Sequence, residues 1–503
     1  MASILRVLFL AAEADPFVKI GGLGDVAGSL PRSLRSLTDP EIPFEVDIRL
    51  VLPYHGSIQR KELSLHRQAT FTMPFGSGET RVEVLNMDSE GLPVSFITGD
   101  LIAPDGPVYS TNIDADGQKF TFFSLASLEL ARKLDWSPHV VHANDWHTAP
   151  AIYALSLMRE NDPFFRTTST LLGLHNLPYM GIGANQSLID FGLPPVKDSR
   201  LPMWAWDVPL PLALLTADHI VAASPTYAQE ILTPEFGSGL HTFLRTRKNH
   251  ISGILNGLDV QRWDPQTDLA INKNFNMRNL SVRAKNKLAL QKEFGLEQGK
   301  DSPLIGMVTR MDHQKGVDLV PEAFRILDRS KLPRPFQAII LGTGDAQLET
   351  AIQNLEVDFP DRVRTLIRFD AALSHRIFAG ADLLLVPSRY EPCGLTQMIA
   401  MRYGCVPLGR RTGGLQDTIE DYNLSMNSTG FLFKRSSSHA LAQALRRAVQ
   451  LYSTNPNAWR GLQKRGMSRD FSWTQSAKHY LQLYTDLSAV IHPDFLRVKE
   501  EQV

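Results

Sequence analysis

Cysteine is scarce in this sequence: of its 503 residues, only Cys393 and Cys405 are cysteines. Two cysteines cannot form a disulfide framework, and their spacing does not provide the Cys-x-x-Cys pairs of a structural metal site. Proteins that depend on disulfides are typical of oxidising compartments. The sequence therefore favours a reducing compartment, and we expect the protein to be cytoplasmic.

An excess of charge of either sign is also missing. The 52 Lys and Arg residues nearly balance the 53 Asp and Glu residues. Proteins dedicated to nucleic acids or to membrane surfaces usually carry a basic excess, because their partners are rich in phosphate. We therefore expect no nucleic acid and no membrane among the partners of this chain.

Long hydrophobic runs are absent as well. No segment approaches the roughly 20 consecutive apolar residues that a membrane-spanning helix needs. The N-terminus lacks a basic region ahead of a long apolar core, and the acidic residues Glu13 and Asp15 follow its first apolar run closely. The N-terminus therefore predicts a first β-strand rather than a signal peptide.

What the sequence does contain is an alternation of short apolar runs with amphipathic stretches. A single core stops growing at roughly 250–300 residues, so a chain of 503 residues predicts two large domains. Runs rich in Val, Ile and Leu are typical of strands buried on both faces of a parallel sheet, with helices as crossovers. The expected strands are residues 5–11, 46–52, 94–98, 140–142, 169–174, 219–223, 304–308, 337–341, 363–367, 383–386 and 405–408. The expected helices include residues 120–134 and 345–357.

This pattern predicts an α/β protein built from two successive βαβ blocks. We place the first domain at residues 1–255 and the second at residues 256–475. A C-terminal helix within residues 476–503 is expected to pack back on the first domain. The polar segment 268–287 follows the boundary, and we expect it to be exposed.

A glycine-rich turn follows the first expected strand. Gly21, Gly22 and Gly24 lie directly before an expected helix at residues 27–37. Backbone amides at the N-terminus of a helix bind phosphate, and the helix dipole adds to the attraction. The glycine spacing is not the dinucleotide-binding fingerprint, and a tight turn that requires positive φ is an equally good interpretation.

Polar side chains follow two successive expected strands. His142, Asp145 and His147 end one strand, and His175 and Asn176 follow the next. Such groups can be metal ligands, general acids and bases, or partners of sugar hydroxyls, although any one histidine is equally consistent with a hydrogen-bonded loop residue. Because ligands of open α/β sheets bind outside the carboxyl ends of the strands, the two strand ends together favour a binding site.

Cationic and glycine-containing turns follow two strands of the second half. Arg310 and Lys315 can converge on a diphosphate, although solvated surface charge is the usual alternative. Glu391 and Gly394 lie in a turn before an expected helix at residues 398–403. There Glu391 can meet a sugar hydroxyl or a developing positive charge, and the alternative is an exposed loop carboxylate.

Taken in this order, these clusters resemble the signatures of the bacterial glycogen synthase and plant starch synthase family, glycosyltransferase family 5. The matching segments are residues 19–25, 142–147, 224–230, 256–263, 310–316, 391–397 and 411–418. Seven motifs in register are far more specific than any one of them. The resemblance implies a GT-B fold, with two Rossmann-like, doubly wound parallel-sheet domains facing a deep inter-domain cleft.

The resemblance also implies how a nucleotide-activated donor is held. Lys19 and the amides of Gly21 and Gly22 would approach the donor phosphates. Phe369 would stack on the nucleotide base, at a position where the family usually carries a Tyr. Further substrate-binding residues implied by position are Asp25, Asp145, Asn176, Asn256, Cys393, Gly394, Leu395 and Thr396.

Four residues from the two domains are implied at the reaction centre. His175 would contact the transferred glucose, and Glu391 would orient its hydroxyl groups. Arg310 and Lys315 would neutralise the diphosphate leaving group, which is the main electrostatic demand of the transition state. The departing phosphate itself would take the proton of the acceptor, so no cofactor and no metal are expected.

The function implied by the resemblance is that of a glycogen or starch synthase. Such an enzyme transfers glucose from ADP-glucose to the non-reducing-end 4-hydroxyl of an α-1,4-glucan, with retention of configuration. ADP-glucose follows from the family alone, since no residue decides between it and UDP-glucose. Two alternatives stay open: a glycosyltransferase of the same fold with another acceptor, and a catalytically weak paralogue that binds glucan. The segment Pro-Leu-Pro-Leu at residues 209–212, where the family often has Lys-Gly-Gly, motivates the first alternative.

Overall fold

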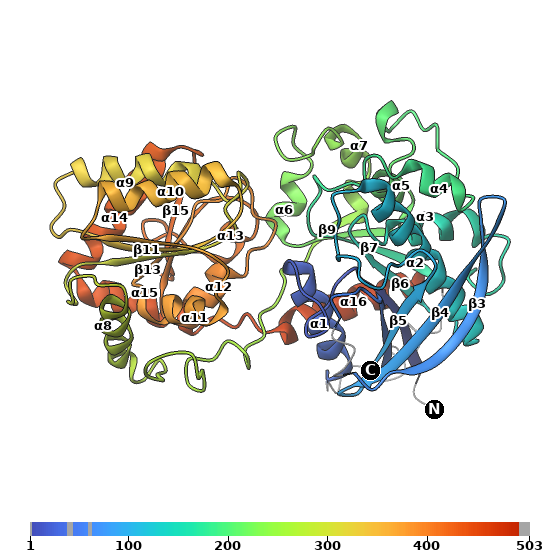
Figure 1. The fold of residues 1–503 in the computed structure, drawn as a ribbon, viewed down its shortest axis with the longest axis horizontal. Helices are drawn as coiled ribbons and strands as arrows, with labels where there is room; N and C mark the ends of the chain where they lie inside the picture. The colour runs from blue at the N-terminus through green and yellow to red at the C-terminus, as the bar shows by residue number, and fades with distance from the viewer. Residues whose placement is uncertain (1–2, 38–43, 59–62, 492–503) are drawn as a thin grey trace, which may run out of the picture. The chain divides into compact units, whose positions relative to one another are not determined.

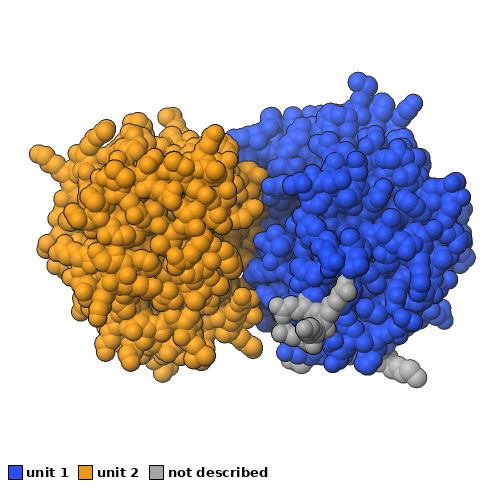
Figure 2. All heavy atoms as spheres, in the orientation of Figure 1, with its two compact units in different colours: residues 1–257, 473–503 blue, residues 258–472 orange. Residues whose placement is uncertain are grey.

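The computed structural model describes residues 3–37, 44–58 and 63–491. Residues 492–503, the end of the segment expected to hold the C-terminal helix, lie outside this range. The chain forms two compact units (Figures 1 and 2): unit 1 comprises Met1–Gly257 and Trp473–Val503, and unit 2 comprises Leu258–Ser472. The first and last residues of unit 2 lie side by side: the amide of Leu258 donates a hydrogen bond to the carbonyl of Phe471 over 2.6 Å.

Within the described residues, the sheet of unit 1 has nine strands in the order β3-β4-β5-β2-β1-β6-β7-β8-β9. Pairing is parallel from β5 to β9. The strands are β1 (Ser3–Leu10), β2 (Phe44–Pro53), β3 (His66–Phe75), β4 (Gly78–Ser89), β5 (Leu92–Gly99), β6 (Val140–Asn144), β7 (Ser169–Leu174), β8 (His219–Ala222) and β9 (Ile251–Gly253). The helices are α1 (Gly22–Arg35), α2 (Ile113–Lys133), α3 (Ala149–Met158), α4 (Asn185–Asp190), α5 (Pro209–Thr216), α6 (Pro225–Glu230), α7 (His241–Thr246) and α16 (Trp473–Ile491), with 3-10 turns at Met203–Ala205 and Lys248–His250.

The sheet of unit 1 is mixed, which differs from the purely parallel sheet that was expected. Strands β3 and β4 form an antiparallel hairpin, and β4 also pairs with β5 in antiparallel fashion. Along β3, buried Phe71 and Met73 alternate with exposed neighbours. A strand that is buried on one face has no continuous apolar run, so the search for such runs passes over it.

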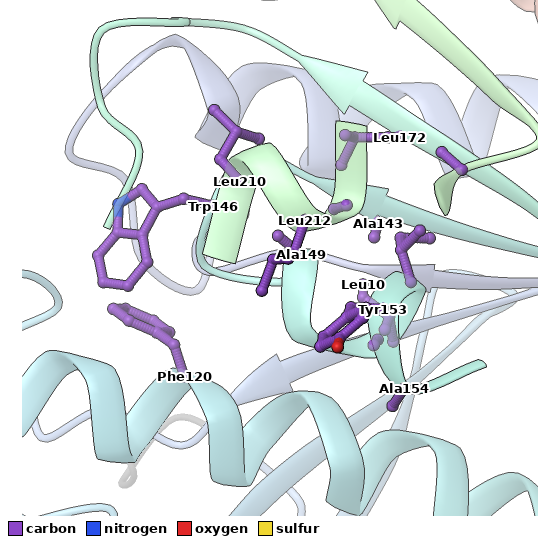
Figure 3. Packing of buried hydrophobic residues seen from close by; sticks show 14 of the residues in the cluster. Leu10, Phe120, Ala143, Trp146, Ala149, Tyr153, Ala154, Leu172, Leu210 and Leu212 are labelled. Carbon is purple, nitrogen blue, oxygen red and sulfur yellow. The ribbon is translucent and has the colours of Figure 1, made fainter. Parts of the chain in front are cut away.

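The two faces of this sheet are covered by different helices. On one face α2, α3 and α5 form a large core, where the Trp146 ring meets Phe120 edge-on at a centroid distance of 5.4 Å (Figure 3). Leu210 and Leu212 of α5 are buried in the same core. On the other face α1 packs beside α16, whose Tyr480 and Tyr484 are buried.

The sheet of unit 2 has six parallel strands, all within the described residues, in the order β12-β11-β10-β13-β14-β15. The strands are β10 (Leu304–Val308), β11 (Gln337–Gly342), β12 (Val363–Ile367), β13 (Leu383–Val386), β14 (Val406–Arg410) and β15 (Phe431–Phe433). The helices are α8 (Arg283–Glu293), α9 (Val320–Arg329), α10 (Ala346–Asp358), α11 (Ala371–Gly380), α12 (Thr396–Arg402), α13 (Gly413–Thr418), α14 (Ser438–Thr454) and α15 (Pro456–Met467), with 3-10 turns at Leu280–Val282 and Val317–Leu319. None of the helices described in either unit has the length and apolar content that crossing a bilayer requires.

Both sheets are doubly wound. In unit 1 the strand order reverses direction between β1 and β6, and in unit 2 it reverses between β10 and β13. Ligands of such sheets bind outside the carboxyl ends of the strands, at these switch points. The predicted fold class, α/β with two doubly wound parallel-sheet domains, is confirmed, with the antiparallel hairpin as an addition to the first.

The expectation that residues 268–287 are exposed is wrong for part of that segment, where Ile271, Phe275 and Leu280 are buried. Arg283, Asn286 and Lys287 of α8 are buried, because the polar face of this helix turns inward. The Lys287 ammonium lies 2.7 Å from a carboxylate oxygen of buried Asp382. The guanidinium of Arg283 lies 3.9 Å from the other carboxylate oxygen of Asp382, so two buried cations share one carboxylate.

We predict that Asp382→Asn destabilises unit 2 by about 3–5 kcal/mol, because removing one partner of a buried ion pair leaves an uncompensated buried charge. Hydrogen exchange of the β10–β14 amides, measured by mass spectrometry, reports the free energy of opening of this unit. The matched control is Asp301→Asn: Asp301 is exposed and its ion pair with Arg334 spans 3.8 Å, so the change should be within about 0.5 kcal/mol. Wild-type protection in Asp382→Asn would mean that backbone carbonyls alone compensate the two cations.

Candidate functional site

The structure places most of the predicted site residues at the carboxyl ends of strands, and the strands that flank the two switch points are among these. In unit 1 they lie in the loops after β1, β6 and β7. In unit 2 they lie in the loops after β10, β12 and β13. The geometry of each group follows within its own unit.

The glycine-rich loop after β1 donates backbone hydrogen bonds to a buried carboxylate. Glu13 accepts hydrogen bonds from the backbone amides of Ile20 and Gly21, the latter at 3.0 Å. The hydroxyl of Tyr109 donates to the same carboxylate over 3.2 Å. The amide of Gly21, predicted to approach a donor phosphate, is thus engaged by Glu13 in this structure, and that of Gly22 is not.

Burial raises the pKa of Glu13 above its ordinary value. The two amide hydrogen bonds and the Tyr109 hydroxyl act in the opposite direction, because they favour the charged carboxylate. Desolvation is the larger effect. The glycine-rich loop is therefore bound to Glu13, a carboxyl group whose charged form is disfavoured by burial.

Lys19, at the start of this loop, is tied to the first turn of α1. Its ammonium lies 2.5 Å from a carboxylate oxygen of Asp25 and 4.0 Å from one of Asp15. The ammonium keeps access to solvent, since the Lys19 side chain is 34% exposed. Asp25 thus holds Lys19 in place, and Lys19 is the member of this pair that can reach an anion.

The carboxylate of Asp145 shapes the loop after β7. Asp145 is buried directly after β6 and has a left-handed backbone, φ +55°. Its Oδ1 accepts from the amides of His175, at 2.7 Å, and Asn176, at 3.3 Å. Burial raises the pKa of Asp145, while the nearby His175 and both amides oppose the shift.

The imidazole of His175 is fixed by the side chain of Asn144. Nε2 of His175 lies 2.9 Å from Oδ1 of Asn144, and Nδ2 of Asn144 donates to the carbonyl of Leu10 over 2.9 Å. His175 itself is half-buried. Burial lowers its pKa, and the carboxylate of Asp145 opposes the shift. His175 is therefore a neutral hydrogen-bonding group at neutral pH.

The other two histidines of this region belong to the core. The imidazole of His142 lies 2.7 Å from the hydroxyl of Tyr484, and burial holds its pKa well below the usual range. His147 packs against the rings of Phe120 and Trp146, and burial lowers its pKa to about 3. His142 is thus a residue of strand β6 and His147 a buried residue of the loop after it, packed among aromatic rings.

Two asparagines of unit 1 have unused hydrogen-bonding capacity. Asn256 is buried in the segment after β9, and Asn176 follows His175. The Oδ1 atoms of both are buried and accept no hydrogen bond from any group in the described part of the chain. A buried acceptor without a donor is costly, so such atoms mark places where a ligand can donate.

In unit 2 the loops after β10 and β13 are joined by an ion pair. The ammonium of Lys315 lies 2.9 and 2.8 Å from the two carboxylate oxygens of buried Glu391, and the hydroxyl of Ser388 donates to Glu391 over 2.7 Å. Gly316 has φ +65°, and a Cβ there would lie 2.2 Å from the carbonyl oxygen of Pro387. Only glycine allows the two loops to approach so closely.

Arg310 and Phe369 lie at the same edge of this sheet but remain exposed. The side chain of Arg310 is 63% exposed, and its guanidinium lies 3.5 Å from a carboxylate oxygen of Asp312. Phe369, in the loop after β12, is 87% exposed. Both side chains are available to a ligand at the carboxyl ends of the strands.

The turn that contains Cys393, Gly394, Leu395 and Thr396 leads into α12. It is braced by α13, because the amide of Gly414 donates to the carbonyl of Glu391 over 3.0 Å. Cys393 is buried, whereas Gly394, Leu395 and Thr396 are half-buried. Glu391 and the half-buried residues 394–396 therefore lie in one short segment that is hydrogen-bonded to α13.

Comparisons of this chain with known proteins identify its family. Residues 6–246 match the starch synthase catalytic domain family, and residues 291–460 match glycosyl transferases group 1. A glycogen synthase of Geotalea daltonii is 39% identical over 490 residues, which span 95% of this chain and 98% of the relative. One from Anoxybacillus flavithermus is 37% identical over 96% of this chain and 98% of the relative.

The chain belongs to the glycogen synthase and starch synthase family. The catalytic domain of starch synthase IV from Arabidopsis thaliana, solved with ADP and acarbose, is similar to this chain with a TM-score of 0.85 and 33% identity. The match covers 97% of this chain and 100% of that one. Family membership confirms the resemblance, the GT-B fold class and the predicted enzyme class, a retaining glucosyltransferase of the glycogen and starch synthase type.

Three residues that hydrogen-bond to candidate site residues were not predicted from the sequence as functional residues. They are Glu13, Asn144 and Ser388. Each is a polar residue at, or shortly after, the end of an apolar strand, and each is buried. That position was the available signal, but the sequence does not show which partner such a side chain reaches.

Among residues 3–37, 44–58 and 63–491, no group of three or more His, Cys, Asp and Glu side chains is arranged to hold a metal ion.

We predict that the stability difference between wild type and Glu13→Gln depends on pH. The raised pKa of Glu13 contributes stability that is present below 4.5, its ordinary value, and is lost as pH rises through the folded-state pKa. Glutamine does not titrate, so the free energy of unfolding of wild type minus that of Glu13→Gln should fall over this window. Denaturation curves at several pH values measure the slope, and a difference independent of pH would contradict the raised pKa.

Proposed function

We propose that this chain transfers glucose from ADP-glucose to the 4-hydroxyl at the non-reducing end of an α-1,4-glucan, with retention of configuration. The observation that carries the proposal is the pairing of Lys315 with buried Glu391 at the switch point of unit 2, in a member of this family. Bound ADP in the Arabidopsis relative supports an adenine nucleotide sugar as the donor.

Cations of unit 2 would stabilise the leaving group. Breaking the bond between glucose C1 and the phosphate oxygen places negative charge on the diphosphate. Exposed Arg310 offers a planar fork of donors to it, and Lys315 a point charge. The departing phosphate oxygen takes the proton of the acceptor hydroxyl on the same face, so the protein need not supply a base.

Glu391 would orient the glucose and oppose the positive charge that develops on its ring. Its carboxylate is held by Lys315 and Ser388, so it needs no reorganisation when the donor arrives. The half-buried amides of Gly394 and Thr396 are proposed partners for the phosphates, as are Lys19 and the amide of Gly22.

Unit 1 carries further proposed partners for the hydroxyl groups of glucose. Neutral His175 is suited to a hydrogen bond with a sugar hydroxyl rather than to proton donation. The buried Oδ1 atoms of Asn176 and Asn256, which have no donor within the described residues, are suited to accept from hydroxyls. Asp145 would act through the His175 loop, since its Oδ1 already accepts from two backbone amides.

A glycosyltransferase of the same fold with another acceptor is the second candidate. It is favoured by α5: its residues 209–212, Pro-Leu-Pro-Leu, are all buried. The segment that often reads Lys-Gly-Gly in the family therefore offers no polar side chain to an acceptor here. Incorporation of labelled glucose into glycogen separates the two candidates.

We predict that purified protein releases ADP from ADP-glucose in the presence of glycogen, and that Arg310→Ala lowers kcat roughly 10²- to 10³-fold. That range is typical for the loss of one group that stabilises transition-state charge. Stability should be unchanged, because the Arg310 side chain is 63% exposed. A nucleotide-release assay with ADP-glucose and UDP-glucose, each with and without glycogen, measures both outcomes.

The matched control for this experiment is Arg334→Ala. Arg334 is an exposed arginine of unit 2 that precedes β11, at the amino ends of the strands. Its removal should leave kcat unchanged. Equal activity of wild type and Arg310→Ala would refute the assignment of Arg310 to the leaving group.

We predict that Phe369→Ala raises KM for ADP-glucose roughly tenfold or more, because stacking of a base on an aromatic ring contributes about 1–3 kcal/mol. Thermal stability should not change, since Phe369 is 87% exposed. Phe369→Tyr keeps the ring and should keep KM. The same KM in Phe369→Ala as in wild type would show that the base binds elsewhere.

A further inference from the structure

Asn144, the last residue of β6, connects three neighbouring strands of unit 1 through its side chain. Its Nδ2 donates to the carbonyl of Leu10 at the end of β1, and its Oδ1 faces Nε2 of His175 after β7, each over 2.9 Å. The residue is 0% exposed. The carboxamide is thus shielded from solvent and has a partner on each side.

The neighbouring strand leaves space for this side chain. Asn144 pairs with Gly173 of β7 in the sheet register. A Cβ at Gly173 would lie 2.5 Å from Oδ1 of Asn144 and 3.0 Å from Nε2 of His142. Any other residue at position 173 would displace the carboxamide from the histidine.

The hydrogen bonds of Asn144 determine where the proton of His175 lies. A carboxamide nitrogen only donates and its oxygen only accepts, so the carbonyl of Leu10 orients the nitrogen toward itself and the oxygen toward the imidazole. Nε2 of His175 must then be the donor. A neutral imidazole carries one proton, so Nδ1 keeps its lone pair. Within the described part of the chain no group donates to this Nδ1.

We propose that Asn144 is a positioning residue of the reaction: it fixes His175 in the tautomer protonated at Nε2, so that Nδ1 accepts a hydrogen bond from a hydroxyl of the donor glucose. The proposal rests on the function proposed above for His175. Asn144 does not touch the substrate itself. It acts through the ring that does.

The physical advantage is a preorganised acceptor. An imidazole without this anchor would populate both tautomers and both ring flips, and Nδ1 would be an acceptor for only part of the time. Fixing the ring during folding removes that cost from the binding step. Two titratable groups act on the ring electrostatically: Asp145, directly after β6, and His142, on β6.

The first arm of the test reads the tautomer in the wild-type protein. Nitrogen NMR of protein with 15N-labelled histidine distinguishes a protonated ring nitrogen from one with a lone pair. The signals of His175 are those that vanish in His175→Ala. Protonated Nε2 with an unprotonated Nδ1 at neutral pH is expected, and the reverse assignment or an even mixture would overturn the proposal. This arm needs no variant of Asn144.

The second arm removes the carboxamide. Asn144→Leu keeps the approximate volume and loses both hydrogen bonds. We expect kcat to fall on the order of 100-fold, as for other misplaced groups at a reaction centre, with KM for glycogen little changed. The His175 signals should move toward a mixture of tautomers. A loss of activity with the wild-type tautomer retained would show that Asn144 only ties the strands together, and unchanged kcat would also overturn the proposal.

A matched control separates a general loss of stability from the specific effect. Tyr484→Phe removes one buried hydrogen bond to His142 on the same strand. It should lower stability and leave kcat and the His175 tautomer unchanged. Failure of the function itself is recognised separately, because wild type would then release no ADP with glycogen, whatever the state of His175.

Discussion

Parallel pairing of buried strands determines where the loops and the polar side chains of this protein lie. In each sheet it brings the carboxyl ends of the strands to one edge, and the reversal of strand order leaves room there between β1 and β6, and between β10 and β13. Side chains far apart in sequence thus become neighbours. Lys315 and Glu391, 76 residues apart, meet only because β10 and β13 are adjacent.

The same constraint buries polar groups at the strand ends, and each of them needs a partner. In unit 1 Glu13 and Asp145 accept from backbone amides of the loops that follow β1 and β7, and Asn144 bonds to the carbonyl at the end of β1 and to the imidazole of His175. A loop that satisfies a buried carboxylate or carboxamide has few alternative conformations. The positions of Lys19 and His175 follow from this requirement for hydrogen bonds.

In unit 2 the buried polar groups at the strand ends are paired by opposite charges. The Lys315–Glu391 pair lies at the carboxyl edge, while the buried group of Arg283, Lys287 and Asp382 lies where β10 and β13 begin. The first joins the loops that follow β10 and β13. The second serves packing, because its donors are directed at carbonyl oxygens such as that of Tyr403. Contacts between a cation and a carboxylate thus occur at both ends of one sheet.

Continuous apolar runs and the turns after them are local patterns, so the α/β class and most of the parallel strands could be predicted from the residues alone. The short edge strands β9 and β15 were not among the expected strands. The loops expected to meet a ligand stay a prediction. The sequence did not reveal the hairpin of β3 and β4, whose strands are buried on one face only. Nor did it show that Asp145 would serve backbone amides, or that Asn144 would face His175, 31 residues away, and Leu10, 134 residues away. These partners could not be read from the residues, since the hydrogen bonds of a buried polar atom depend on which distant strands the sheet brings beside it.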